Sequence, residues 1–306
     1  MSLPTQAVRY VIVSPVKDEE KYVEITLQAV IRQTVRPSLW VIVDDGSHDQ
    51  TPEILGRYAR SDPWIRVLRI NRDANRQLGL AEIRAFQVGY QLASAEDFDF
   101  IVKLDCDLDF APDYFQQLIR KFNEDEGLGI ASGIYLENQL GEWHPVPMPA
   151  YHAAGASKMV RRQCFQDMGG FVLFPGWDTV DEIKAQARGW KTRHFETLQF
   201  RHLKNEGSAS GATSTSLLHG EVCYVTGAGK IWVLLKALHR MATGRPFVWG
   251  GLIMIWGYVR AWLARQPLLV SDAEARFYRR LLNRRLLEGI GKFLGLKPKN
   301  EVRSSS

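Results

Sequence analysis

Residues 99–110 read DFIVKLDCDLDF, an apolar run that passes directly into acidic residues. Short apolar runs of this length, rich in β-branched and aromatic residues, are typical of buried strands. In an extended chain, residues two positions apart point to the same side, so Asp105 and Asp107 present their carboxylates together. The stretch therefore predicts a buried strand whose carboxyl end carries a pair of acidic groups.

Upstream of this stretch, short apolar runs alternate with amphipathic segments that have helical spacing. The alternation predicts an α/β fold in which helices flank a mostly parallel sheet. A further helix is expected around residues 80–93, directly before the strand. The alternating segments are RYVIVSPV (9–16), EKYVEITLQAVIRQ (20–33), LWVIVDDGS (39–47), TPEILGRYARS (51–61) and IRVLRI (65–70).

Acidic residues follow the ends of several of these strands. Ligands of open α/β sheets bind outside the carboxyl ends of the strands, so acidic groups from separate segments should converge at one edge. The sequence contains neither GxGxxG after its first strand nor GxxxxGK[ST], which argues against hydride transfer and P-loop ATP hydrolysis. The acidic residues expected at this edge are Asp18, Glu19, Asp44, Asp45, Asp105 and Asp107.

The pair Asp105 and Asp107 has the chemistry of a site for a hard divalent cation. Mg²⁺ and Mn²⁺ prefer carboxylate oxygens, and phosphate oxygens often complete their coordination shell. A cation held here would neutralise the diphosphate leaving group of a nucleotide sugar. The alternative interpretation is a solvated acidic turn, because charged clusters usually lie on exposed surfaces.

Five segments stand out along the chain: VIVSPVKDEE (11–20), VIVDDGSHDQT (41–51), KLDCDLDF (103–110) with Pro112 and Asp113, RRQCFQDMGGF (161–171) and GWDTVDEIKAQARGW (176–190). Together, in this order, they resemble the family 2 glycosyltransferases, which are inverting enzymes of GT-A fold. The resemblance covers roughly residues 10–202. It implies a nucleotide pocket lined by Pro15, Glu19, Asp45 and Arg84, with Asp105 beside it.

The VDDGS turn has a physical role of its own in this interpretation. The carboxylates of Asp44 and Asp45 can accept hydrogen bonds from a nucleobase and a ribose, while Gly46 and Ser47 allow a tight turn. Arg84 stands in AEIRAF, where the family often carries AxARN.

An inverting transfer needs one carboxylate that takes a proton from the acceptor hydroxyl. The resemblance places this base about eleven residues before Gly189, which selects Asp178, although Trp177 stands where the family carries Glu. Asp181 is the second candidate, because Asp181 and Glu182 lie one helical turn further on. The alternative interpretation is structural, with Asp178 as an N-cap and Asp181 as an acidic residue favoured near a helix N-terminus.

The resemblance also adds a third metal ligand. Related enzymes often have a metal- or diphosphate-binding histidine at the position of His202. Asp105, Asp107 and His202 are therefore the expected ligands of Mg²⁺ or Mn²⁺. The alternative is a surface histidine.

The C-terminal part of the chain differs from the rest in charge. From Glu221 to the end, fifteen Lys and Arg stand against five Asp and Glu, a net charge of +10, whereas residues 1–220 carry −5. We therefore expect a glycosyltransferase domain over residues 1–220 and a basic, helical, membrane-associating region over residues 221–306.

Residues 222–271 contain no acidic residue and are apolar and rich in tryptophan. KIWVLLKALHRM (230–241) has apolar positions at helical spacing with cations between them, as an interfacial helix has. The uncharged segment 247–259 would rise about 20 Å as a helix, less than the roughly 30 Å of hydrocarbon in a bilayer. A monotopic or re-entrant element is preferred over a transmembrane helix or a buried helix pair. Nucleic-acid binding is not expected, because no base-reading module is present.

Cysteine usage and the N-terminus favour a cytoplasmic protein. Three cysteines without metal-ligand spacing indicate neither a disulfide framework nor structural zinc, and residues 1–20 lack the features of a signal peptide. We expect a peripheral or monotopic enzyme at the cytoplasmic face of the membrane. It would transfer one sugar from a nucleotide-sugar donor to a lipid-linked saccharide in cell-surface polysaccharide synthesis, on an anionic membrane surface. The alternative is an inactive glycan- or nucleotide-binding protein at the membrane.

Overall fold

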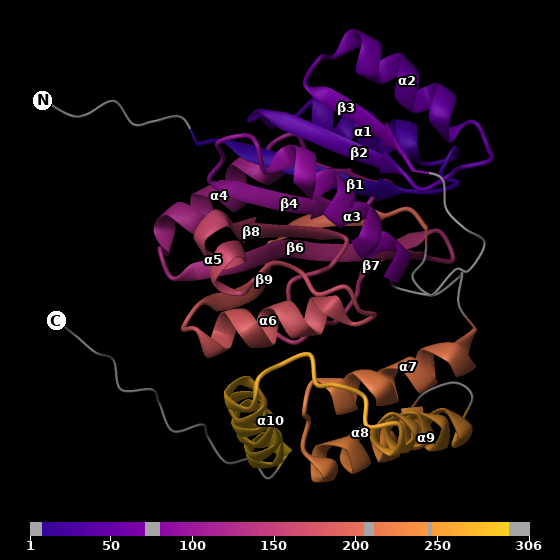
Figure 1. Ribbon diagram of the computed structural model, residues 1–306, viewed down its shortest axis with the longest axis vertical. Coiled ribbons are helices and arrows are strands. Elements are labelled where there is room, and N and C mark those ends of the chain that lie inside the picture. Colours follow the sequence, from indigo (N-terminus) through magenta and orange to yellow (C-terminus); the bar gives the residue numbers. More distant parts are fainter. Residues whose placement is uncertain (1–7, 71–79, 205–210, 244–246, 294–306) are drawn as a thin grey trace, which may run out of the picture. The chain divides into compact units, whose positions relative to one another are not determined.

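The computed structural model describes residues 8–70, 80–204, 211–243 and 247–293 (Figure 1). The chain divides into two compact units, Met1–Ser210 and Gly211–Ser306. The charge pattern predicts the boundary ten residues later, at 220. The two positions differ because residues 212–220 belong to helix α7 (Ala212–Val225), which packs against another helix of the second unit.

Among the described residues of the first unit, the strands form one sheet of nine. They are β1 (Tyr10–Val16), β2 (Leu39–Asp44), β3 (Ile65–Arg69), β4 (Phe100–Leu104), β5 (Leu108–Phe110), β6 (Leu128–Gln139), β7 (Glu142–Pro145), β8 (Ser157–Arg161) and β9 (Lys191–His202). The order is β3-β2-β1-β4-β8-β6-β9-β5, and β7 pairs with β6.

The direction of the strands divides the sheet into two parts. Strands β3, β2, β1 and β4 run parallel to one another, and β9 runs parallel to β6. Strand β8 is antiparallel to both of its neighbours, and β5 is antiparallel to β9. The predicted α/β fold with a mostly parallel sheet flanked by helices is confirmed. In its parallel part, the carboxyl ends of β1, β2 and β4 meet at one edge.

Helices cover both faces of this sheet. The helices of the first unit are α1 (Val23–Ile31), α2 (Thr51–Ser61), α3 (Leu80–Ala93), α4 (Tyr114–Glu124), α5 (Arg162–Asp167) and α6 (Trp177–Ala187). Tyr10 and Ile12 of β1 lie in one apolar layer with residues of α1 and α4. Val11 and Val13 lie in the other, with residues of α3, α5 and α6. Because alternate residues of a strand face opposite sides, burial on both faces explains the continuous apolar run of β1.

The second unit is helical. Its helices are α7 (Ala212–Val225), α8 (Lys230–Thr243), α9 (Trp249–Leu263) and α10 (Asp272–Phe293). Helices α7 and α9 approach each other at glycines: a Cβ on Gly257 would lie 2.2 Å from the Leu217 carbonyl oxygen, and one on Gly220 would lie 2.0 Å from the Met254 carbonyl oxygen. In the described part of the chain, every helix is too short or too polar to cross a membrane.

Gly89 and Gly56 offer a matched test of how α3 sits on the sheet. A Cβ on Gly89 would lie 2.5 Å from Val13 Cγ1 and 2.9 Å from Val43 Cγ2, whereas one on Gly56 of α2 would meet only the flexible Arg60 side chain at 3.5 Å. We expect Gly89→Ala to lower the free energy of unfolding by about 1–3 kcal/mol through overpacking. Gly56→Ala should leave it unchanged or raise it by up to about 1 kcal/mol through helix propensity. Urea unfolding of both variants measures the difference, and equal effects would contradict the packing described.

Candidate functional site

Hydrogen bonds tie together the two loops that follow β1 and β2. Asp18 has a left-handed backbone, with φ at +53°, which Asp tolerates better than most residues. Its N–H donates to Ser47 Oγ at 2.9 Å, and its carboxylate accepts from the His48 N–H at 2.8 Å. The Glu19 N–H donates to Thr51 Oγ1 at 2.9 Å. The segment VDDGSHDQT therefore fixes the loop that carries Glu19.

Asp44 and Asp45 lie at the end of β2, and both are buried. Asp44 Oδ1 accepts from the Ser47 N–H at 2.8 Å, and Asp44 Oδ2 lies 3.5 Å from Arg69 Nε. The Asp44 carboxylate is thus engaged in holding the turn. Asp45 follows it directly at the strand end.

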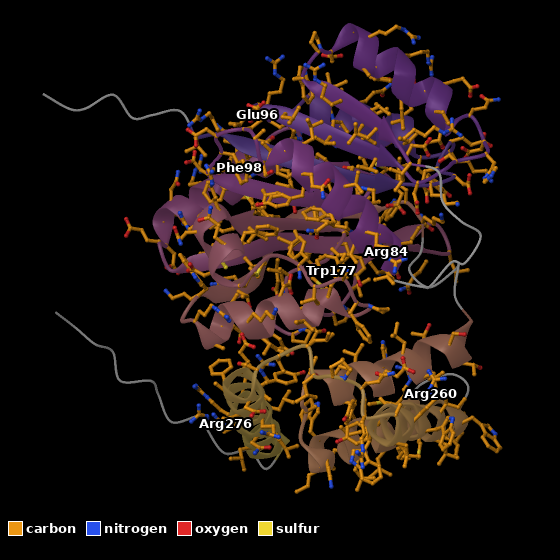
Figure 2. The ribbon with its side chains drawn as sticks, viewed as in Figure 1. Arg84, Glu96, Phe98, Trp177, Arg260 and Arg276 are labelled. Atoms are coloured by element: carbon orange, nitrogen blue, oxygen red, sulfur yellow. The ribbon has the colours of Figure 1, made fainter. Side chains whose placement is uncertain are left out.

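Pro15 and Arg84, which are also expected at the nucleotide, differ in their exposure to solvent. Pro15 is half-buried in β1 and pairs in register with Val43. Arg84 is exposed on α3 (Figure 2). Two residues earlier on the same helix, Glu82 forms an ion pair with the buried Lys103. The polar contact from α3 to the acidic pair is therefore made by Glu82.

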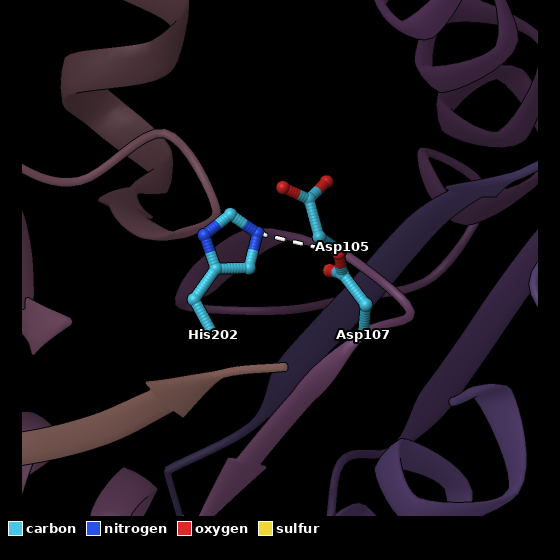
Figure 3. A group of neighbouring side chains, drawn as sticks. All are labelled: Asp105, Asp107 and His202. Atoms are coloured by element: carbon cyan, nitrogen blue, oxygen red, sulfur yellow. Dashed lines mark ion pairs between the residues drawn. The ribbon is translucent and has the colours of Figure 1, made fainter. Parts of the chain in front are cut away.

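Strand pairing brings a histidine to the acidic pair (Figure 3). The register of β5 and β9 sets Leu108 opposite His202, and the Leu203 N–H donates to the Asp107 carbonyl oxygen at 2.8 Å. His202 Nε2 lies 3.3 Å from Asp107 Oδ2. One ligand atom from each of Asp105, Asp107 and His202 lies within 4.8 Å of the others. The three residues predicted to hold a metal are thus neighbours.

These three side chains fit one divalent cation. Ligand atoms bound at about 2.1 Å lie about 3–4.2 Å from one another around an ion, so shifts of less than about 1 Å would close the cluster. Asp107 is 7% exposed and His202 is 6% exposed. The burial of Asp107 is not that of a solvated acidic turn, and the burial of His202 is not that of a surface histidine, so neither alternative interpretation holds. Two carboxylates brought this close, one of them buried and the other half-buried, favour a cation between them.

A buried lysine holds the other side of Asp105. The Lys103 side chain is 1% exposed, and its Nζ donates to Asp105 Oδ1 at 2.6 Å. Burial would lower the pKa of Lys103, but the carboxylates of Asp105 and Glu82 raise it, so the ammonium stays charged. Burial raises the pKa of Asp105 to about 7; Lys103 opposes this shift, and the charges of Glu82 and Asp107 add to it. Proton release from Asp105 is therefore coupled to the cations around it.

Glu19 belongs to the same neighbourhood. Its Oε1 lies 2.6 Å from Lys204 Nζ, just beyond the end of β9. Burial raises the pKa of Glu19; the hydrogen bond from Lys204 lowers it, and the charge of Asp107 raises it. The ends of β1, β4 and β9 thus place Glu19, Asp107 and Lys204 within electrostatic reach of one another.

The candidate bases on α6 differ in environment. Asp181 is fully buried, and its Oδ2 accepts from Lys158 Nζ at 2.8 Å. Glu182 accepts from the Ala153 N–H at 2.8 Å and lies 3.0 Å from His152 Nδ1. Burial raises the pKa of Asp181 to about 7, with Lys158 opposing the shift. Both carboxylates are engaged inside the protein, which leaves neither open to an acceptor hydroxyl.

Asp178 is the accessible carboxylate of this helix. It lies half-buried in the first turn of α6, and Lys158 Nζ donates to its main-chain carbonyl oxygen at 3.1 Å. The N-cap of α6 is Gly176, with φ at +90°, so Asp178 does not cap the helix as the structural alternative proposes. Asp178 therefore remains the first candidate for the base, and Lys158 positions it.

Residues 11–172, more than half of the chain, match the sequence pattern described as Glycosyl transferase family 2. The chain belongs to glycosyl transferase family 2. The family predicted from the motifs is thereby confirmed, and the match spans the strands β1 to β8 with their acidic edge.

Known proteins support the family and the fold. The uncharacterized glycosyltransferase YkcC of Bacillus subtilis (strain 168) is 30% identical over 120 residues, 38% of this chain and 34% of YkcC. The chain spans about a third of the length of the curated relatives it matches. S. aureus TarS 1-349 in complex with UDP-GlcNAc has a TM-score of 0.55 at 14% identity, covering 84% of this chain and 73% of that chain. PcManGT, a mannosyltransferase from Pyrobaculum calidifontis in complex with GDP-Man and Mn²⁺, has a TM-score of 0.53 at 15% identity, covering 96% and 85%. This likeness confirms the GT-A fold.

Two buried lysines of this family 2 domain were not predicted from the sequence. Trp177 is 5% exposed (Figure 2), and the ammonium groups of Lys103 and Lys158 lie 5.5 and 5.1 Å from the centroid of its ring. The indole of α6 thus packs against both lysines, which are neighbours on the adjacent strands β4 and β8. A lysine inside the apolar run FIVKL is the one sequence signal of this arrangement, because such a residue needs buried acidic partners.

Lys158 provides the sharpest test of this charged core. Lys158→Met leaves Asp181 and Glu182 buried without their cation, which should lower the free energy of unfolding by about 3–5 kcal/mol. Lys191 is the matched control, because its pair with Asp125 at 2.8 Å is exposed. Lys191→Met should cost less than about 1 kcal/mol. Thermal and urea unfolding compare the two variants. A Lys158→Met variant as stable as the unmodified protein would contradict a buried ion pair between Lys158 and the α6 carboxylates.

Metal binding should depend on pH through Asp105. With a pKa of about 7, Asp105 is about one-tenth ionised at pH 6 and about nine-tenths ionised at pH 8. A cation needs the ionised form, so we expect Mn²⁺ affinity to rise about tenfold between these values. Calorimetric titration with Mn²⁺ measures the change. His202→Asn should weaken binding but keep the pH dependence; loss of that dependence in the variant would assign it to the imidazole instead.

Proposed function

We propose that this chain transfers one sugar, with inversion, from a nucleotide-diphosphate sugar to an acceptor. The observation that carries the proposal is the cluster of half-buried Asp105 with buried Asp107 and His202, which lies at the carboxyl edge of the sheet beside Glu19. Mg²⁺ or Mn²⁺ at this cluster would supply positive charge to the diphosphate of the donor. The complexes of PcManGT with GDP-Man and of TarS with UDP-GlcNAc support this donor class.

The donor nucleoside would lie over the ends of β1 and β2. Asp45 is the expected hydrogen-bond acceptor for the nucleobase or ribose, with Asp44 holding its turn through Ser47. Pro15 and Glu19 follow along β1 and its loop, and Arg84 is available on the exposed side of α3. Glu19 and Asp107 are within electrostatic reach, so a nucleotide on β1 would direct its diphosphate toward the metal cluster.

Asp178 would act on the acceptor. Its carboxylate takes the proton of the acceptor hydroxyl while that oxygen forms a bond to the anomeric carbon. The bond from the anomeric carbon to the diphosphate oxygen breaks at the same time, and its electron pair leaves with the nucleoside diphosphate. Attack on the side opposite the leaving group inverts the anomeric configuration. Lys158 positions this base by holding the first turn of α6.

For the acceptor, we propose a lipid-linked saccharide used at the cytoplasmic face of a membrane, in cell-surface polysaccharide synthesis. The second unit supports this choice, because its residues 222–271 carry six Lys and Arg and no acidic residue. An anionic membrane surface would attract such a unit. An inactive glycan- or nucleotide-binding protein is the alternative, and it predicts donor binding without turnover.

Donor hydrolysis by the whole 306-residue chain tests the proposal. UDP-, GDP- and dTDP-sugars are supplied with and without Mn²⁺, beside Asp107→Asn and the control Asp109→Asn. Asp109 lies two residues further along β5, but its carboxylate pairs with Arg32 and Arg201. We expect slow, Mn²⁺-dependent release of one nucleoside diphosphate, lowered at least about a hundredfold by Asp107→Asn and little changed by Asp109→Asn.

The same assay separates the base from the metal ligands. Asp178→Asn should keep Mn²⁺-dependent nucleotide binding and lower turnover by about 10²–10⁴-fold, because it removes only the proton acceptor. Donor binding without hydrolysis in the unmodified protein, with every acceptor and metal tried, would support the inactive binding protein. An equal loss of Mn²⁺-dependent hydrolysis in Asp109→Asn and Asp107→Asn would contradict the assignment of Asp107 to the metal cluster.

A further inference from the structure

Helix α8 leaves one apolar side uncovered. Its exposed side chains recur at positions i, i+3, i+4 and i+7, which places them along one side of the helix. Val233 and Ala237, on a different side, are buried in the core of the second unit. The exposed residues, as fractions of their full accessible area, are Ile231 (73%), Leu234 (52%), Leu235 (38%) and Leu238 (50%).

Helix α9 repeats this arrangement with larger side chains. Its buried side consists mostly of small residues: Gly250, Gly251, Met254, Gly257 and Ala261. A Cβ on Gly251 would lie 2.4 Å from the Ala237 carbonyl oxygen, so this side meets the backbone of α8. The opposite side exposes Trp249 (65%), Leu252 (43%), Trp256 (57%) and Leu263 (62%). Glycine inside and tryptophan outside is the reverse of the pattern expected for a helix facing water.

Cationic side chains accompany these apolar sides. Lys230 and Lys236 are exposed on α8, and Arg260 is half-exposed on α9 (Figure 2), where it pairs with Glu221. No acidic residue occurs between 222 and 271. An apolar surface edged by charges of one sign matches a lipid bilayer that offers hydrocarbon beneath anionic headgroups. Tryptophan is also enriched at the interface between headgroups and hydrocarbon.

We propose that the exposed sides of α8 and α9, defined by the eight apolar residues named above and hereafter the α8–α9 surface, bind an anionic lipid bilayer without crossing it. The proposal deepens the proposed function and rests on it for the biological reason to be at a membrane, since a lipid-linked acceptor is found there. The described helices are too short or too polar to span, so binding would be interfacial.

A second copy of the chain fits the α8–α9 surface less well. A two-fold dimer brings the same patch of both subunits together. Lys230 and Lys236 would then face their own like-charged counterparts, whereas Arg260 already pairs with Glu221. A bilayer with anionic headgroups removes this repulsion, so the charge pattern favours lipid over self-association.

Site-specific labelling tests the proposal on the whole 306-residue chain. Cys106, Cys164 and Cys223 are buried, so a cysteine introduced on the surface can be labelled selectively with an environment-sensitive nitrobenzoxadiazole dye. Leu234→Cys and Leu252→Cys place the dye on α8 and α9. Leu140→Cys is the control, because Leu140 is fully exposed in the first unit. Each protein is mixed with vesicles of phosphatidylcholine alone or with phosphatidylglycerol added.

The expected result is a blue shift and a gain in dye emission at 234 and 252, but not at 140, with vesicles that contain phosphatidylglycerol. In co-sedimentation, Leu234→Ser combined with Trp256→Ser should lower vesicle binding at least about tenfold. Lys236→Glu should lower vesicle binding by about fivefold or more, and added salt should also lower it.

Two results would overturn the proposal. One is unchanged emission at 234 and 252 at every vesicle composition. The other is an emission change that follows protein concentration without vesicles, which would assign the surface to a second copy. Hydrolysis of the donor in solution separates this proposal from the proposed function, because Leu234→Ser with Trp256→Ser alters only the second unit and should leave hydrolysis unchanged. An enzyme that hydrolyses the donor but ignores vesicles would contradict the lipid surface alone.

Discussion

Repulsion between carboxylates at the carboxyl edge of the sheet governs the arrangement of the whole site. Glu19, Asp44 and Asp105 each lie beside a cationic side chain, from Lys204, Arg69 and Lys103 respectively. Buried carboxylates without such partners would be very costly. Asp107 shares its space with Asp105, lies beside a histidine that carries charge only when it is protonated, and is within electrostatic reach of Lys204. A divalent cation at this point would neutralise these carboxylates as the lysine and arginine side chains neutralise the others. It would also attract the negative charge of a donor diphosphate.

The same electrostatic constraint extends to the acceptor side of the domain. Lys158, fully buried, holds Asp181 and Glu182 and the first turn of α6, which leaves Asp178 as the accessible carboxylate. The Trp177 ring packs against both the Lys158 and the Lys103 ammonium groups, which belong to paired positions of β8 and β4. Packed, charged side chains therefore connect the metal cluster with the first turn of α6.

The sequence predicts the parts of this structure that are locally encoded. Apolar runs ending in Asp44 or Asp105 specify both a buried strand and the edge at which its chemistry lies. His202 depends on the pairing of β5 with β9, which no local pattern contains, and only the family resemblance identified it. Helical spacing could not tell Asp178 from Asp181, because the distinction rests on Lys158, a residue brought in by β8. Lys103, Lys158 and Glu82 were not predicted as parts of the site for the same reason. A buried lysine is identified by the carboxylates that pair with it, and these come from other elements of the fold.

The central claim is that Asp105, Asp107 and His202 hold the cation that receives the donor diphosphate. Anomalous diffraction at the manganese edge tests it most directly, on crystals of the protein grown with Mn²⁺ and each of UDP, GDP and dTDP. The account predicts one strong anomalous peak within about 2.3 Å of Asp107 and His202, with diphosphate oxygens completing the shell. A nucleotide bound over β1 and β2 with no manganese at this cluster, or manganese bound elsewhere, would contradict it.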